Sequence, residues 1–239
     1  MTTKTKVTRS RPAGSTRPRP NSRNRPGDRK GRGLLVAVVV AMVAALVLAV
    51  AITVAGGGGD GDDAATSDFD TSSVAVAPGT RPLPLLPEAG ADPAVGQAAP
   101  PVDGIDRAGE QLTLPASGRP TILVFVAHWC PHCQAEVPRL QQWLDEGALP
   151  EGVDVAAVAT GFDPDRPNYP SSAWLDREGW TPPTVADADG TAAAAYGLTS
   201  FPFWVSVAAD GTVVERGTGE LTLQEVTDMA VEARDAAPT

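Results

Sequence analysis

The residues of this chain best suited to chemistry lie together in the stretch VAHWCPHCQAEVP, at positions 126–138. This stretch holds both cysteines and both histidines of the 239-residue chain, namely His128, Cys130, His132 and Cys133. Two neighbouring thiols suit reversible redox chemistry, because one sulfur can attack a disulfide while the other resolves the mixed disulfide. A structural disulfide is a poorer explanation, since a bridge across two residues closes too small a loop to stabilise a fold much.

The same residues allow a second interpretation, as a copper or zinc binding or transfer site. Sulfur and imidazole nitrogen suit both metals, so His128, Cys130, His132 and Cys133 are the candidate ligands. A structural zinc site usually joins two separated ligand pairs, however, and these four residues are crowded together around Pro131. Disulfide exchange is therefore the preferred hypothesis. It needs no bound cofactor, because the two cysteines carry both electrons. A non-catalytic binding module, which has no need of a dithiol, is the third alternative.

The segments on either side of the motif predict how it is positioned. PTILVFVA (120–127) is typical of a buried strand, and residues 130–146 repeat apolar side chains at helical spacing. Cys130 then begins a helix, where the backbone N–H groups and the helix dipole favour a thiolate. His132 can add imidazolium charge there, and Pro131 suits the first helical turn. Cys133 falls about one turn further along and is expected to be more shielded.

The rest of the C-terminal half predicts an α/β domain with a mixed central sheet flanked by helices. Asp210-Gly211 lies between two alternating apolar runs and indicates a hairpin. Thr222 and Glu225 have the spacing of a capping box. The remaining predicted strands are 110–114, 153–160 and 183–189, and the remaining predicted helices are 171–179, 190–198 and 222–235.

WCPHC at a strand-to-helix junction resembles the active site of the thioredoxin-fold thiol–disulfide oxidoreductases. Pro138 matches the proline within the active-site helix of that family, and TSFPFWV (199–205) matches its cis-proline loop. The resemblance implies that Cys130 is the nucleophile, that Cys133 resolves the mixed disulfide, and that Phe201–Pro202 is a cis bond facing the dithiol. It also implies that the groove for client proteins is lined by Trp129, Phe201 and Pro202.

Two further likenesses point in opposite directions. Residues 95–114 and the insertion at 161–183 resemble the membrane-anchored proteins of cytochrome c maturation and extracytoplasmic thiol reduction. The Pro-His dipeptide instead resembles that of the strong disulfide oxidants, so the direction of exchange stays open.

The chain also departs from the family at one position. Many thioredoxins carry a buried acid where this chain has Val124. The remaining candidates for moving the proton of Cys133 are Glu136, which is expected to face solvent, and Asp187 and Asp189 on a neighbouring strand.

The N-terminal third predicts a membrane protein. Residues 1–33 carry eleven basic residues and one acid and read as a disordered cytoplasmic arm. Residues 34–55 are uncharged and almost entirely apolar, and roughly 20 apolar residues span a bilayer as a helix. Positive flanks stay in the cytoplasm, so this signal anchor places everything after it outside. Residues 56–94, rich in Gly, Pro and Asp, are expected to form an extended linker to a thioredoxin-like domain at 95–239.

Charge and location indicate the partners. The part of the chain after residue 33 carries 28 acidic and 8 basic residues, which argues against nucleic acid as a partner. We therefore expect a single-pass protein of the cell membrane. Its partners are client proteins with cysteines or disulfides and a redox protein in the same membrane.

Overall fold

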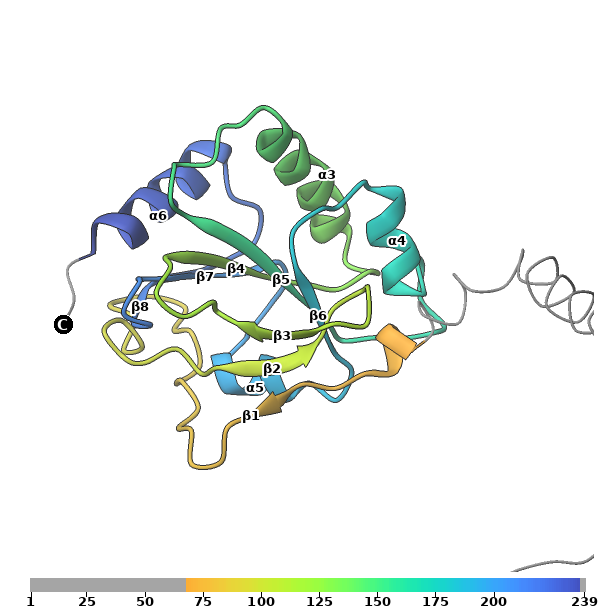
Figure 1. The fold of residues 1–239 in the computed structure, drawn as a ribbon, viewed down its shortest axis with the longest axis horizontal. Helices are drawn as coiled ribbons and strands as arrows, with labels where there is room; N and C mark the ends of the chain where they lie inside the picture. Colours follow the sequence, from red (N-terminus) through yellow and green to blue (C-terminus); the bar gives the residue numbers. More distant parts are fainter. Residues whose placement is uncertain (1–67, 237–239) are drawn as a thin grey trace, which may run out of the picture. The chain divides into compact units, whose positions relative to one another are not determined.

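The architecture is drawn in Figure 1 from a computed structural model that describes residues 68–236. The strands are β1 (Ala75–Val76), β2 (Val102–Ile105), β3 (Gln111–Leu114), β4 (Thr121–Val126), β5 (Asp154–Thr160), β6 (Thr184–Asp187), β7 (Phe203–Val207) and β8 (Val213–Thr218). The helices are α3 (Pro131–Asp145), α4 (Ser171–Arg177), α5 (Thr191–Tyr196) and α6 (Leu223–Asp235).

The larger sheet has five strands in the order β6-β5-β4-β7-β8. Strands β4, β5 and β6 pair in parallel, whereas β7 pairs antiparallel with both β4 and β8, so the predicted mixed sheet is confirmed. Every residue of β4 is buried, because the strand is central and both its faces are covered. Burial on both faces explains why this strand reads as one apolar run rather than an alternating one.

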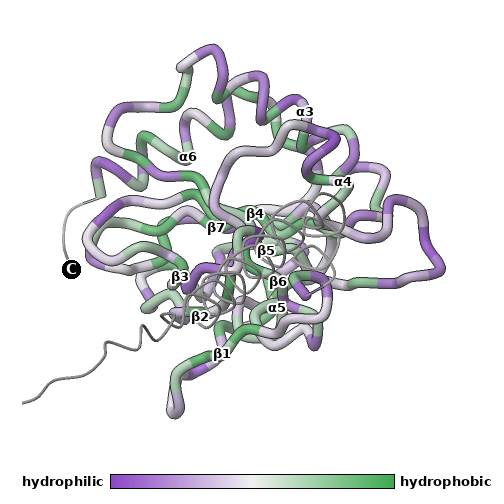
Figure 2. Tube along the Cα trace, turned by 45° about the vertical axis from the view of Figure 1, so that its right-hand side comes forward, coloured by the Kyte–Doolittle hydropathy of each residue, from purple (hydrophilic) through white to green (hydrophobic). Residues whose placement is uncertain are grey.

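Helices α3, α4 and α6 cover one face of this sheet, and α5 covers the other together with the small antiparallel sheet β1-β2-β3 (Figure 1). Two apolar clusters fill the two interfaces, one around Trp143, Trp174 and Trp204 and the other around Phe125 and Tyr196. Figure 2 shows the hydrophobic strands β4, β5 and β7 between these layers. The layered arrangement, with a helix leaving the end of the central strand, is the thioredoxin-like α/β fold.

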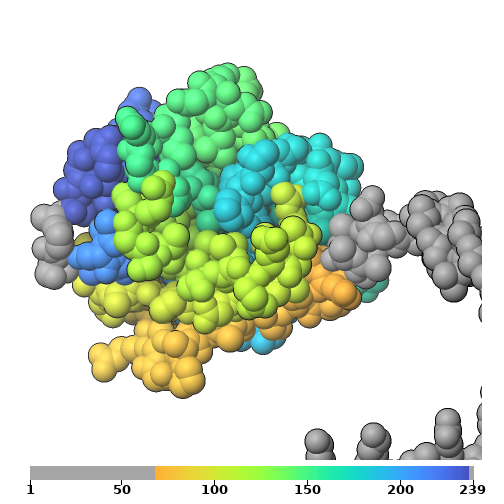
Figure 3. All heavy atoms as spheres, in the orientation of Figure 1, coloured from red at the N-terminus to blue at the C-terminus, as the bar shows by residue number. Residues whose placement is uncertain are grey.

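The beginning of the domain differs from the prediction. Residues 68–94 were expected to belong to an extended linker, but they lie against the domain, as the orange and yellow surface in Figure 3 shows. Phe69, Val74 and Leu83 are buried, and the Leu83 amide donates to the Ala195 carbonyl at 2.8 Å. The proline-rich composition suggested a tether because these apolar residues are too widely spaced to show a period. The folded part therefore includes Asp68 onward rather than starting near residue 95.

The predicted arm at 1–33 and the predicted membrane span at 34–55 lie outside the described residues. Among the helices of residues 68–236, none is both long and apolar enough to cross a membrane.

Local signals account for the ends of several elements. The predicted capping box of α6 is confirmed, with Thr222 and Glu225 each bonding the other's backbone amide. Gly211 has a φ of +87°, which the tight β7–β8 hairpin requires. Helix α4 is capped by a residue distant in sequence, Asp70, whose carboxylate accepts the amides of Ser171 and Ser172 at 2.7 and 3.3 Å.

Candidate active site at the start of helix α3

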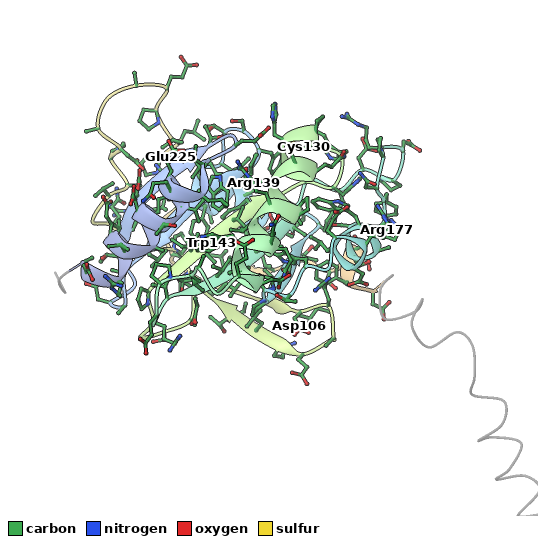
Figure 4. The ribbon with its side chains drawn as sticks, turned by 90° about the horizontal axis from the view of Figure 1, so that it is seen from above. Asp106, Cys130, Arg139, Trp143, Arg177 and Glu225 are labelled. Atoms are coloured by element: carbon green, nitrogen blue, oxygen red, sulfur yellow. The ribbon has the colours of Figure 1, made fainter. Side chains whose placement is uncertain are left out.

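Both cysteines lie where the central strand passes into α3. Cys130 is the N-cap residue of the helix, and Pro131 occupies its first turn as predicted. Figure 4 places Cys130 at one end of α3, with Arg139 and Trp143 further along the same helix. The structure has both cysteines as free thiols. Cys130 has 6% of its surface exposed and Cys133 has none, so Cys130 is the sulfur that a client can reach.

The predicted cis-proline loop faces this dithiol. The Phe201–Pro202 bond is cis, and the Cys130 thiol points to the Phe201 carbonyl at an Sγ–O distance of 3.8 Å. The amide of Gly219 donates to the Pro202 carbonyl at 2.8 Å, which fixes the loop from its other side. The carbonyl that precedes the proline is therefore held beside the reactive sulfur.

Trp129 and Phe201 form an aromatic wall next to Cys130. Their rings meet edge to face with centroids 5.9 Å apart, and both side chains are partly buried. The indole Nε1 of Trp129 donates to the Gly161 carbonyl at 2.6 Å, and the guanidinium of Arg166 lies 4.4 Å from its ring centroid. The structure thus brings Trp129, Phe201 and Pro202 together around Cys130, as predicted.

The thiol of Cys133 lies in a protected environment. Burial raises the pKa of the Cys133 thiol far above its usual range, and the nearby charges of Cys130 and Glu136 raise it further. The Ala127 amide opposes this effect by donating to the Cys133 sulfur at 3.5 Å. Cys133 therefore keeps its proton until a neighbouring group removes it, which suits a resolving cysteine.

Glu136 is a site residue whose burial the sequence analysis missed. Its side chain is 1% exposed rather than facing solvent, and its carboxylate bonds the guanidinium of Arg139. Burial raises the pKa of the Glu136 carboxyl, and Arg139 offsets only part of that effect. The helix pattern contained the signal, because Glu136 follows Cys133 by three residues and so shares its face of α3. The other two candidates lie elsewhere, since Asp187 caps α5 through the Ala192 amide and Asp189 is exposed.

The two histidines point to different places. His132 is exposed, and its Nδ1 lies 2.6 Å from Oε1 of Glu220 in the β8–α6 loop. No local pattern could have indicated Glu220, which comes 88 residues later in the chain. His128 is fully buried and bonds the backbone of residues 163 and 167.

These orientations bear on the metal hypothesis for His128, Cys130, His132 and Cys133. His128 turns toward the β5–α4 segment, while His132 turns outward to Glu220. Among residues 68–236, no group of three or more His, Cys, Asp and Glu side chains is placed to hold a metal ion. The geometry thus favours thiol chemistry over metal binding.

A dithiol at the start of a helix, facing a cis-proline loop in a thioredoxin-like fold, defines the class of the thiol–disulfide oxidoreductases. Residues 94–231 match the family model described as Redoxin. The chain belongs to the Redoxin family.

Curated relatives carry names that agree with this class. The chain is 29% identical over 122 residues to the thiol-disulfide oxidoreductase ResA of Halalkalibacterium halodurans, a match that covers 51% of this chain and 66% of that protein. It is 23% identical over 124 residues to the sporulation thiol-disulfide oxidoreductase A of Bacillus subtilis, covering 52% of this chain and 74% of that one. The crystal structure of StoA from Bacillus subtilis is similar with a TM-score of 0.48 at 23% identity, over 57% of this chain and 98% of that one.

Proposed function

We propose that this protein exchanges disulfides with client proteins outside the cytoplasm, through the dithiol of its Cys-Pro-His-Cys motif. The observation that carries the proposal is the placement of the Cys130 sulfur 3.8 Å from the Phe201 carbonyl, with Cys133 buried behind it. A client chain that lies along the cis-proline loop brings its own sulfur to Cys130. Cys133 is out of its reach.

The exchange proceeds in two balanced steps. In the reducing direction, the Cys130 thiolate attacks one sulfur of a client disulfide, that bond breaks, and the other client sulfur leaves and takes up a proton. Cys133 then loses its proton and attacks the sulfur of Cys130. This step forms the Cys130–Cys133 disulfide and releases the second client thiol. The client gains two electrons and the protein loses two, and the oxidising direction is the exact reverse.

Glu136 is the group best placed to handle the proton of Cys133. Its buried carboxyl has a raised pKa, and it acts electrostatically on the Cys133 thiol. A carboxyl that titrates closer to neutrality is a better proton acceptor and donor than an exposed one.

Substitution of each cysteine tests the proposal. We expect Cys130→Ser to abolish exchange with a cysteine-containing peptide, because the attacking sulfur is lost. Cys133→Ala is expected to accumulate a mixed disulfide through Cys130 that a reductant dissolves. Exchange that persisted in Cys130→Ser would refute the assignment of the nucleophile.

The direction is assigned by a redox titration of the full chain against glutathione. A reduction potential of about −120 to −180 mV corresponds to a protein that oxidises clients, and about −270 mV to one that reduces them. Reoxidation or rereduction would then come from a redox protein in the same membrane.

We further propose that residues 34–55 anchor the protein in the membrane with its N-terminus in the cytoplasm. The support is the distribution of charge, with basic residues before the apolar segment and acidic ones after it. Protease added to intact spheroplasts should digest the domain but leave the N-terminal arm protected. Protection of the domain instead would contradict this topology.

A further inference from the structure

His128 is a buried titratable side chain, two residues before the nucleophile, that the exchange chemistry does not use. Its ring is fully buried. Nδ1 lies 2.7 Å from the carbonyl oxygen of Pro167, and the amide of Asp163 donates to Nε2 at 3.2 Å. Because Nδ1 faces a carbonyl and Nε2 faces an N–H, the ring donates at Nδ1 and accepts at Nε2. Both ring nitrogens are thus committed to residues 161–170, the β5–α4 loop.

Other contacts of His128 reach the same loop. Its ring stacks on Phe162 with centroids 6.4 Å apart and meets Tyr169 edge-on at 5.6 Å. Its backbone carbonyl accepts the side-chain amide of Asn168 at 3.3 Å, and that of Gln134 on α3 at 2.9 Å. His128 therefore contacts the loop near its beginning, at residues 162–163, and toward its end, at residues 167–169, while its own backbone is bonded to the active-site helix through Gln134.

The β5–α4 loop in turn supports the aromatic wall beside Cys130. Gly161 accepts the indole N–H of Trp129 at 2.6 Å, and Arg166 lies over the Trp129 ring. Gly161 has a φ of +67°, and a Cβ built there would lie 3.4 Å from the Phe201 ring. The loop thus touches both members of the wall, and its position depends on the residue that holds it.

We propose that His128 is a positioning residue, which holds the β5–α4 loop against Trp129 and Phe201 and thereby sets how well an extended client chain docks beside Cys130. The inference rests on the proposed exchange with protein clients. On this proposal, the reactivity of the Cys130 sulfur and the docking of a client peptide are separate properties of the site. A small thiol needs only the sulfur of Cys130, whereas a peptide also needs the aromatic wall in place.

Two exchange rates measured on one preparation test this separation. The oxidised full chain in detergent is mixed with reduced glutathione and, in parallel, with an octapeptide that contains a single cysteine. His128→Leu removes both ring hydrogen bonds, and we expect it to slow the peptide reaction about tenfold while the glutathione rate stays within about twofold. His128→Asn is expected to recover part of the peptide rate, because its amide can still donate to the Pro167 carbonyl.

A matched control distinguishes positioning from a general loss of stability. Tyr196→Phe removes a buried hydrogen bond of 2.7 Å to the Pro100 carbonyl, in the apolar cluster on the other face of the sheet. We expect this variant to keep the wild-type ratio of peptide to glutathione rates. Urea unfolding of each variant confirms that the assays are run on folded protein.

The outcomes distinguish a failure of the role proposed for His128 from a failure of the proposed disulfide exchange. An unchanged rate ratio in His128→Leu would overturn the inference, and so would an equal fall of both rates, because the effect would then act through Cys130. A similar fall of the ratio in Tyr196→Phe would also overturn it. A wild-type protein that reacted with neither thiol would instead refute the proposed function.

Discussion

Arg216 fastens the beginning of the domain to strand β8, and its replacement is expected to be costly. The side chain is fully buried, and its Nε and Nη2 bind the two carboxylate oxygens of Asp92 at 2.8 and 2.6 Å. Its Nη1 donates to the carbonyl oxygens of Pro84 and Tyr196 at 2.9 and 2.7 Å. One guanidinium therefore joins β8, the end of α5 and the segment 84–92. Residues 84–92 form no strand, so β-sheet hydrogen bonds do not hold this segment in place.

The cost follows from what Arg216→Leu leaves behind. The Asp92 side chain is only 12% exposed, so the variant strands a nearly buried carboxylate and two carbonyl acceptors. Breaking a buried ion pair from one side costs about 3–5 kcal/mol. At about 2–4 °C per kcal/mol for a domain of this size, the melting temperature should fall by about 6–20 °C. Restoring an apolar partner in Arg216→Leu/Asp92→Leu should recover part of the loss, since no charge is then stranded.

Urea and thermal unfolding followed by circular dichroism measure both variants. The matched control is Arg119→Leu, which breaks an ion pair with Asp154 at 2.5 Å whose two side chains are 53% and 36% exposed. Water already solvates that pair, so the control should unfold at nearly the wild-type midpoint. The reasoning is refuted if Arg216→Leu unfolds like the control, or if the double variant is less stable than the single one.

Two further outcomes are expected. Burial raises the pKa of Glu136 in the native state, so the native state holds that proton more tightly than the unfolded chain does. The wild-type protein should therefore lose stability as pH rises above 4.5, and Glu136→Gln should not show this loss. Urea midpoints from pH 4 to 7 that fall equally in both proteins would contradict it. Thr222→Ala should cost about 1 kcal/mol in urea unfolding through loss of the α6 capping box, and an unchanged midpoint would show that the cap contributes nothing.

Local patterns were sufficient for the parts of the site that lie close together in sequence. The strand-to-helix junction at Cys130, the cap at Thr222 and the hairpin at Gly211 each depend on residues within a few positions of one another. Phe201 and Pro202 lie far from the dithiol in sequence. Their position opposite it came from resemblance to a family rather than from any local period.

Contacts between distant residues account for what the sequence did not reveal. Asp70 caps α4 from 101 residues away, and Arg216 binds Asp92 from 124 residues away. Neither contact leaves a periodic signal, so the segment that contains Asp70 and Asp92 was predicted as a linker from its composition. Glu136 is different, because its spacing from Cys133 does place both on one face of α3.

The hold of Asp70 on α4 has a mechanical consequence. Ser171 follows directly after the β5–α4 loop, so the chain enters the domain at the point where that loop ends. A pull applied ahead of Asp68 acts first on Phe69, which packs against Ala159 of β5 and Ala186 of β6, and on Asp70, which holds the first turn of α4. Tension on the N-terminal side is therefore shared between one edge of the large sheet and the helix that follows the β5–α4 loop, whereas α3, which carries both sulfurs, is not held directly by this segment.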